Sequence, residues 1–268
     1  MEVEEKYLHR IDAAGGDRRV RLETPSSFVY DDECGLFGEL AACWNVAYDR
    51  RTLEQRWFVS SARIVDGTFR HILAPAFDGA RMWSVEYGVS TYRLVGVDLA
   101  SGARSVESTI MRTSSGQTEL LLGPPVITAS GDVAVYVHGT REGPRGALEL
   151  YAPDGSRRWA FVAPRAPRST PAGGAVFSGE ATHLAGRAGL LYLAMGHAVY
   201  AVEPDGTERW RVEGLGDLNE PGVNLSDNGD LYVRDADGVL TAIATESFGL
   251  ARSPWPIPGA DARLSNAR

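Results

Sequence analysis

Lysine is nearly absent from this sequence, because Lys6 is its only lysine and arginine supplies almost all of the positive charge. The 27 basic residues are outnumbered by 35 acidic ones, which gives a formal net charge of -8. Such a chain repels a phosphate backbone on average, and no block of lysine or arginine compensates locally. Nucleic acid is therefore not expected as a partner.

Long apolar runs are also lacking. No run approaches the roughly 20 residues that a helix needs to cross a bilayer, so no transmembrane segment is predicted. The opening Met-Glu-Val-Glu-Glu is acidic, whereas a signal peptide opens with basic residues and continues with apolar ones.

The residue patterns of common catalytic and metal sites are missing as well. The five histidines are widely separated, and no nucleophile elbow, phosphate-binding loop or dinucleotide fingerprint is found. Asp227-Asn-Gly-Asp230 and Asp235-Ala-Asp-Gly238 look like fragments of a calcium loop but lack its full set of oxygens, so they are interpreted as turns. No catalytic, cofactor-binding or metal-binding residue is predicted.

Glycine, by contrast, is plentiful. The chain has 30 glycines, 44% hydrophobic residues and 9% aromatics, a combination typical of short apolar segments joined by tight turns. This composition predicts an all-β protein.

A sequence repeat runs along the chain. Leu150-Tyr-Ala-Pro-Asp-Gly-Ser-Arg-Arg-Trp159 matches Ala201-Val-Glu-Pro-Asp-Gly-Thr-Glu-Arg-Trp210, and both are typical of a hairpin. Looser copies cover residues 10–20, 47–57 and 96–106, and a degenerate one covers 242–252. Each of the first five copies ends on one large apolar residue: Val20, Trp57, Val106, Trp159 and Trp210. These residues are 37 to 53 positions apart, which is the range of four-stranded propeller blades.

Alternating or fully apolar segments precede the repeats, for example residues 132–138, 189–195 and 230–234. Each unit thus offers about four short strands. The chain is predicted to be a β-propeller of four-stranded antiparallel blades, with five complete units and a partial one at the N-terminus.

The repeated residues have recognisable physical roles. An aspartate accepts hydrogen bonds from turn amides, a glycine adopts a positive φ, and a tryptophan lies between adjacent sheets. The predicted structural repeat residues are Asp49, Trp57, Gly102, Gly155, Trp159, Gly206 and Trp210.

These residues resemble a known motif. Ala47, Asp49, Thr52 and Trp57 match the spacing Ala-x-Asp-x-x-Thr-Gly-x-x-x-Trp, with Leu53 in the glycine position. This spacing is similar to the tryptophan-docking motif of the PQQ-like (quinoprotein/BamB-like) β-propeller repeat family. The resemblance implies the propeller fold, and because the family is commonly exported, it also implies a periplasmic or extracellular location.

The whole chain, 1–268, is interpreted as one propeller domain. Residues 1–25 form a partial blade, which is either a genuine partial blade or the remainder of a longer protein, and we expect upstream sequence to be missing. Residues 253–268 resemble a segment found at a terminus of such propellers and are expected to be a closing tail at the natural C-terminus.

Two further features leave alternatives open. Cys34 and Cys43 bracket a possible hairpin, and they form either a disulfide, which requires an oxidising compartment, or two buried free thiols. Arg165 and Arg168 lie in a proline-rich stretch that is either a solvated connector or a partner-binding loop.

The function expected from these features is a non-catalytic binding or scaffold propeller of the bacterial envelope or cell surface, with an unidentified protein partner and no bound cofactor. The alternative is a quinoprotein-like oxidoreductase domain that binds PQQ. Against it, Cys34 and Cys43 are not adjacent as in the vicinal cysteine pair of quinoprotein dehydrogenases, and no matching calcium-binding cluster is visible.

Overall fold

The computed structural model describes residues 7–11, 17–21, 34–37, 39–43, 46–58, 75–88, 91–112, 124–137, 147–164, 181–186, 188–218 and 222–252. Within these ranges the chain forms strands and turns and no helix, which confirms the all-β prediction. It follows that this part of the chain holds no helix suited to crossing a membrane.

In the described part of the chain the strands form six antiparallel sheets, which follow one another in the order of the sequence. The first is a pair, β1 (Tyr7–Ile11) and β2 (Asp17–Arg21). Four sheets with four strands each follow: β3 (Cys34–Phe37), β4 (Leu40–Cys43), β5 (Val46–Asp49) and β6 (Gln55–Phe58); β7 (Ala76–Phe77), β8 (Arg81–Gly88), β9 (Thr91–Asp98) and β10 (Arg104–Arg112); β11 (Val126–Ile127), β12 (Val133–Val137), β13 (Ala147–Tyr151) and β14 (Arg157–Val162); β15 (Ala181–Ala185), β16 (Leu191–Met195), β17 (Ala198–Val202) and β18 (Glu208–Glu213). The last sheet has three strands in the described part of the chain: β19 (Gly222–Leu225), β20 (Asp230–Arg234) and β21 (Leu240–Ala244).

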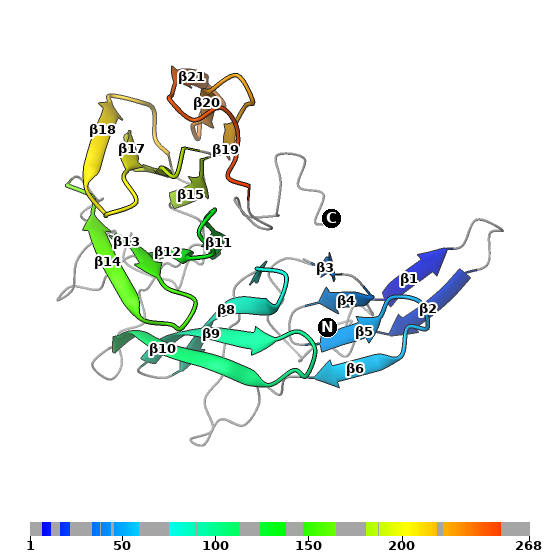
Figure 1. Ribbon diagram of the computed structural model, residues 1–268. Coiled ribbons are helices and arrows are strands. Elements are labelled where there is room, and N and C mark those ends of the chain that lie inside the picture. Colours follow the sequence, from blue (N-terminus) through cyan, green and yellow to red (C-terminus); the bar gives the residue numbers. More distant parts are fainter. Residues whose placement is uncertain are drawn as a thin grey trace.

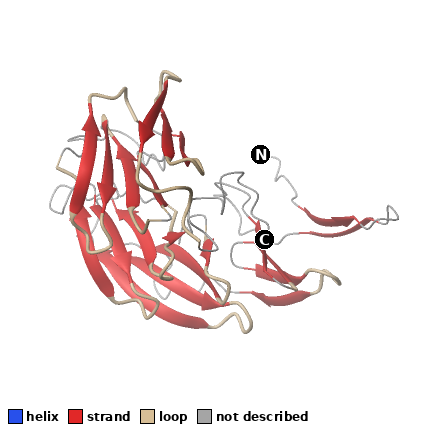
Figure 2. Cartoon of the chain, turned by 45° about the horizontal axis from the view of Figure 1, so that its top comes forward, coloured by secondary structure: helices blue, strands red, loops and turns tan. Residues whose placement is uncertain are grey.

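The sheets are the blades of a β-propeller and follow one another along an arc (Figures 1 and 2). Their first strands β7, β11, β15 and β19 are neighbours in that order, and their fourth strands β6, β10, β14 and β18 lie along the outside of the arc. The pair β1–β2 lies at one end of the arc and the sheet β19–β21 at the other. The predicted four-stranded antiparallel blades are confirmed.

The apolar core lies between consecutive blades. One cluster joins Trp57 and Ala47 to buried side chains of β8 and β9, and another joins β12 and β13 to β16 and β17. The third joins β16 and β17 to β20. β5, β13 and β17 are buried throughout, so these third strands need cover on both faces, which the neighbouring blades provide.

Candidate protein-interaction surface

In four blades an aspartate carboxylate accepts hydrogen bonds in the turn between the third and fourth strands, but the turn has two forms. Asp49 and Asp98 begin a longer turn, whereas Asp154 and Asp205 lie inside a shorter one. A carboxylate oxygen of Asp98, Asp154 or Asp205 accepts hydrogen bonds from the amide and the hydroxyl of a following serine or threonine. Asp49 accepts instead from the amides of Arg51 and Thr52, both at 2.9 Å. These bonds stabilise the ionised form, so they lower the pKa of Asp49 to about 2.

The indole of Trp57 joins its blade to the next one. Its Nε1 donates to the carbonyl oxygen of Leu99 at 2.6 Å, and its ring covers Gly102. Gly102 has φ of 71°, and a Cβ there would lie 2.8 Å from the Cβ of Trp57. The glycine is therefore required both by its backbone angle and by the tryptophan above it.

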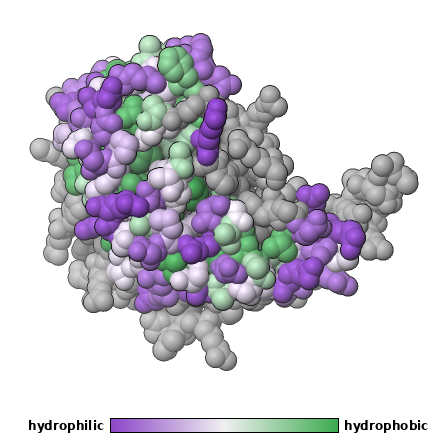
Figure 3. Space-filling model, viewed as in Figure 1, coloured by the Kyte–Doolittle hydropathy of each residue, from purple (hydrophilic) through white to green (hydrophobic). Residues whose placement is uncertain are grey.

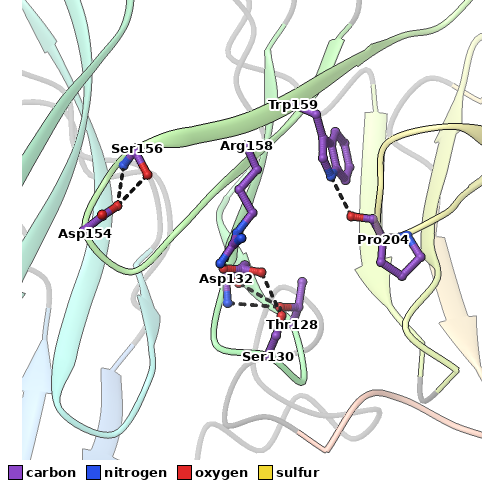
Figure 4. Close-up of polar contacts among 8 residues, drawn as sticks. All are labelled: Thr128, Ser130, Asp132, Asp154, Ser156, Arg158, Trp159 and Pro204. Atoms are coloured by element: carbon purple, nitrogen blue, oxygen red, sulfur yellow. Dashed lines mark hydrogen bonds and ion pairs between the residues drawn. The ribbon is translucent and has the colours of Figure 1, made fainter.

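The same contact recurs two blades further on. Trp159 Nε1 donates to the carbonyl oxygen of Pro204 at 2.8 Å (Figure 4). Its indole covers Gly206, which has φ of 89°. In the blade between them Val106 lies against Gly155. Trp210 packs against the third core cluster and tilts against Tyr192, with ring centroids 5.8 Å apart.

The depth of these tryptophans differs. Trp57 is buried, whereas Trp159 and Trp210 are only half-buried. The equivalent offset from the turn places all three in the fourth strand, but the strand lies at the outer edge of its blade, where the next blade covers the indole to a different extent.

The last blade presents an unusual exposed edge. In the other blades the third strand is largely buried, but β21 alternates between exposed and half-buried residues. Val239 and Leu240 are 57% and 63% exposed, and Phe248 is 61% exposed. Figure 3 shows hydrophobic side chains at the surface in this upper part of the molecule, among hydrophilic ones.

The outer side of β21 offers backbone hydrogen-bonding groups. The amide of Asp235 donates to the carbonyl of Val239, and the amide of Thr245 donates to the carbonyl of Gly229. Between these two hydrogen-bonded pairs, every second residue pair of β20 and β21 is hydrogen-bonded. The alternation turns the amides and carbonyls of Leu240, Ala242 and Ala244 away from β20. No strand in the described part of the chain pairs with this side of β21. We define the candidate surface as β21 together with Val239 and Phe248.

Other predicted site residues lie elsewhere. Cys34 and Cys43 are direct cross-strand partners in the backbone register of β3 and β4. Arg165, Arg168 and the tail 253–268 lie outside the described residues. In the ranges that the structure describes, no group of three histidine, cysteine or acidic side chains is arranged to hold a metal ion. The segments 227–230 and 235–238 form turns, as interpreted.

The sequence reasoning missed the exposed edge. The available signal was the degenerate sixth repeat at 242–252: residues 239–245, which lead into it, carry no charge, and no Arg-Trp follows them. In a repeat protein, a unit without the outer strand motif is a place to expect an open edge.

The structure of BamB supports this fold, and two further solved structures are similar to a lesser degree. BamB from Moraxella catarrhalis matches with 17% identity and a TM-score of 0.53, over 85% of this chain and 63% of that chain. A quinohemoprotein alcohol dehydrogenase from Pseudomonas putida HK5 matches with 18% identity and a TM-score of 0.44, over 77% of this chain and 40% of that one. The C-terminal WD40 domain of Sif2 matches with 12% identity and a TM-score of 0.39, over 89% and 74% of the two chains.

No family model matches the sequence, and no curated protein matches it. This chain spans just under two thirds of the length of the BamB structure. At 17% identity the likeness concerns the fold, and the chain is a β-propeller whose fold is similar to that of BamB.

Proposed function

We propose that this protein is a non-catalytic binding module, a propeller scaffold that holds a protein partner at the open edge of its last blade. The exposed apolar residues Val239, Leu240 and Phe248 beside unpaired strand groups carry the proposal. Val239 and Leu240 lie at the start of β21 and Phe248 lies just beyond its end, so exposed apolar side chains flank both ends of this edge. Exposed apolar side chains along an unpaired strand edge are typical of a protein-binding site.

Affinity capture from the source organism tests the binding role. The wild-type chain should retain a reproducible protein, and Leu240→Asp should lose it because a charge at the patch opposes apolar contact. Val162→Asp is the matched control, since Val162 is also an exposed apolar residue, 46% exposed, but lies on the fourth strand of a complete blade. Equal retention by both variants would contradict the proposed surface. Dye-linked alcohol oxidation after PQQ and calcium are added would contradict the non-catalytic role.

We further propose an envelope or cell-surface location. The pairing of Cys34 with Cys43 supports this location. Residues 38 and 39 join β3 to β4, so Phe37 and Leu40 are the pair that closes the turn, and the cysteine pair is the third pair beyond it. In a two-residue hairpin the closing pair is hydrogen-bonded, so alternation makes the cysteine pair a non-hydrogen-bonded one with Cα atoms about 4.5 Å apart. This separation is within the range of disulfides.

Thiol titration tests the location. Protein purified from its native compartment, denatured without reductant, should show no free thiol, because an oxidising compartment maintains the disulfide. The same sample after reduction should show two thiols and serves as the control. Two free thiols before reduction would contradict both the disulfide and the exported location.

A further inference from the structure

We propose that the open edge of β21 binds one extended strand of a partner protein, and that this strand carries an arginine followed directly by a large apolar residue. The inference rests on the proposed function and adds the chemistry of the partner. It is carried by a comparison between the last blade and the complete blade β11–β14.

The two blades begin in the same way. In the complete blade, the amide of Thr128 donates to the carbonyl of Asp132 at 2.9 Å, and the hydroxyl of Thr128 accepts from the amide of Asp132 at 3.1 Å. In the last blade, Ser226 and Asp230 make the same two contacts at 2.9 and 3.0 Å. Asp132 and Asp230 therefore occupy equivalent positions at the start of the second strand.

In the complete blade this aspartate binds the fourth strand. Arg158 Nε of β14 donates to Asp132 Oδ1 at 2.9 Å, and the turn residue Ser130 donates to Asp132 Oδ2 at 2.8 Å (Figure 4). One carboxylate oxygen thus serves the turn and the other holds the outer strand. Asp132 is buried beneath the strand that it binds.

In the last blade only half of this arrangement is present. Asn228 Nδ2 donates to Asp230 Oδ2 at 2.8 Å, which reproduces the turn contact. No described side chain donates to Asp230 Oδ1, the oxygen equivalent to the one that binds Arg158. Asp230 is half-buried, so it is more exposed than Asp132, which a fourth strand covers.

The register of the strands determines where the other residues of the bound strand lie. In the complete blade, Val133 pairs with Tyr151 and Ala134 pairs with Leu150. Leu150 pairs in turn with Trp159, the residue that directly follows Arg158. The residue of the last blade that corresponds to Leu150 is Ala242, which pairs with Tyr232. An incoming strand that places its arginine at Asp230 therefore places its apolar residue opposite Ala242, where the backbone groups face outward.

Charge favours the same partner. Residues 222–252 contain five acidic side chains and two basic ones. Each fourth strand of the complete blades contains at least one arginine, and Arg56, Arg158 and Arg209 directly precede a tryptophan. An acidic blade with an open edge thus complements a basic strand, and strand addition provides backbone hydrogen bonds along that edge.

A peptide from the chain itself is a suitable probe. A fluorescein-labelled peptide of residues 156–162, Ser-Arg-Arg-Trp-Ala-Phe-Val, has the required pattern. Its fluorescence anisotropy should rise to saturation with the full chain, and replacing the arginine at position 158 of the peptide by glutamate should abolish binding. In the protein, Asp230→Asn should weaken binding about tenfold, because a charge-assisted hydrogen bond is lost.

Ala242→Pro separates strand addition from other modes of binding. Proline removes an amide that faces outward and leaves the bonds to β20 in place, so the variant should keep its circular dichroism and melting temperature but lose the peptide. Ala242→Ser, which retains the amide, should bind as the wild type does. A folded Ala242→Pro variant that binds the peptide would overturn the inference. If that variant also still captures the partner, the proposed binding function stands while its strand-addition mechanism fails.

Hydrogen exchange of the isolated protein tests whether the edge of β21 is covered instead by the chain itself or by a second copy of it. The amides of Ala242 and Ala244 should exchange rapidly without the peptide and become protected when it is added. Protection in the isolated monomer would show that the chain covers its own edge, and protection that rises with dimer content would identify a second copy. Either result overturns the proposed partner strand.

Discussion

Trp57→Ala should lower the free energy of unfolding by about 3–5 kcal/mol, the range for deletion of a buried aromatic side chain. The indole is buried in the first core cluster and donates to Leu99 in the next blade. Its removal leaves a cavity between two blades and an unpaired carbonyl oxygen. Urea titration followed by circular dichroism measures the loss.

Two tryptophans provide the comparison. Trp159→Ala and Trp210→Ala remove half-buried indoles, so each should cost about half as much as Trp57→Ala. Trp57→Phe retains most of the ring and loses the hydrogen bond to Leu99, and it should cost about 1 kcal/mol through that bond. If all three alanine variants keep the wild-type midpoint, the interblade role of the tryptophans is wrong.

A substitution at Gly102 tests the same contact from the neighbouring blade. Gly102→Ala introduces a Cβ that would lie 2.8 Å from Trp57 and strains a positive φ. In the Trp57→Ala background the contacts with the indole ring, at 2.8 and 3.0 Å, are relieved, while the contact with the Cβ of residue 57 and the backbone strain remain. The combined variant should therefore lose less stability than the two single losses added together.

The hairpins of the propeller could be predicted from the sequence because their determinants are local. Pro-Asp-Gly at 153–155 and 204–206 specifies a turn between strands, and the aspartate, glycine and tryptophan lie within one repeat. The structure places β13 and β14, and β17 and β18, on either side of these turns. Even Leu53, found in a glycine position, adopts a positive φ of 60° because the turn requires it.

The candidate surface could not be predicted in the same way. Asp230 looks like a turn residue in the sequence, and its likeness to Asp132 depends on the register between β20 and β21. Exposure of β21 depends on which strands cover it, a property of the assembled blade. The depth of Trp159 and Trp210 likewise depends on how far the next blade reaches over them.

The pairing of the two cysteines could be predicted only in part. The sequence indicates a hairpin between Cys34 and Cys43 but leaves its turn unspecified. A shift of one residue in the turn would move the cysteines to opposite faces. The structure pairs Phe37 with Leu40, and that pairing places Cys34 opposite Cys43.

Arg104→Ala should also cause a large loss of stability, about 3–5 kcal/mol, because it removes the cation that pairs with a buried carboxylate. Arg104 donates from Nη1 and Nη2 to the two oxygens of Glu86, at 3.0 and 2.6 Å. The side chain of Glu86 is only 5% exposed, so water does not replace the lost contact. Thermal and urea unfolding of the variant measure the effect.

Arg93→Ala is the matched control for this ion pair. Arg93 lies on β9, the strand beside Arg104, and pairs with Glu107 at the surface, where the two side chains are 38% and 42% exposed. An exposed pair contributes about 1 kcal/mol or less, since water solvates the remaining charge. Arg104→Lys keeps the positive charge but loses the two-point geometry, so its loss should fall between those of the two alanine variants. Equal losses for Arg104→Ala and Arg93→Ala would mean that burial of Glu86 does not govern the strength of its ion pair.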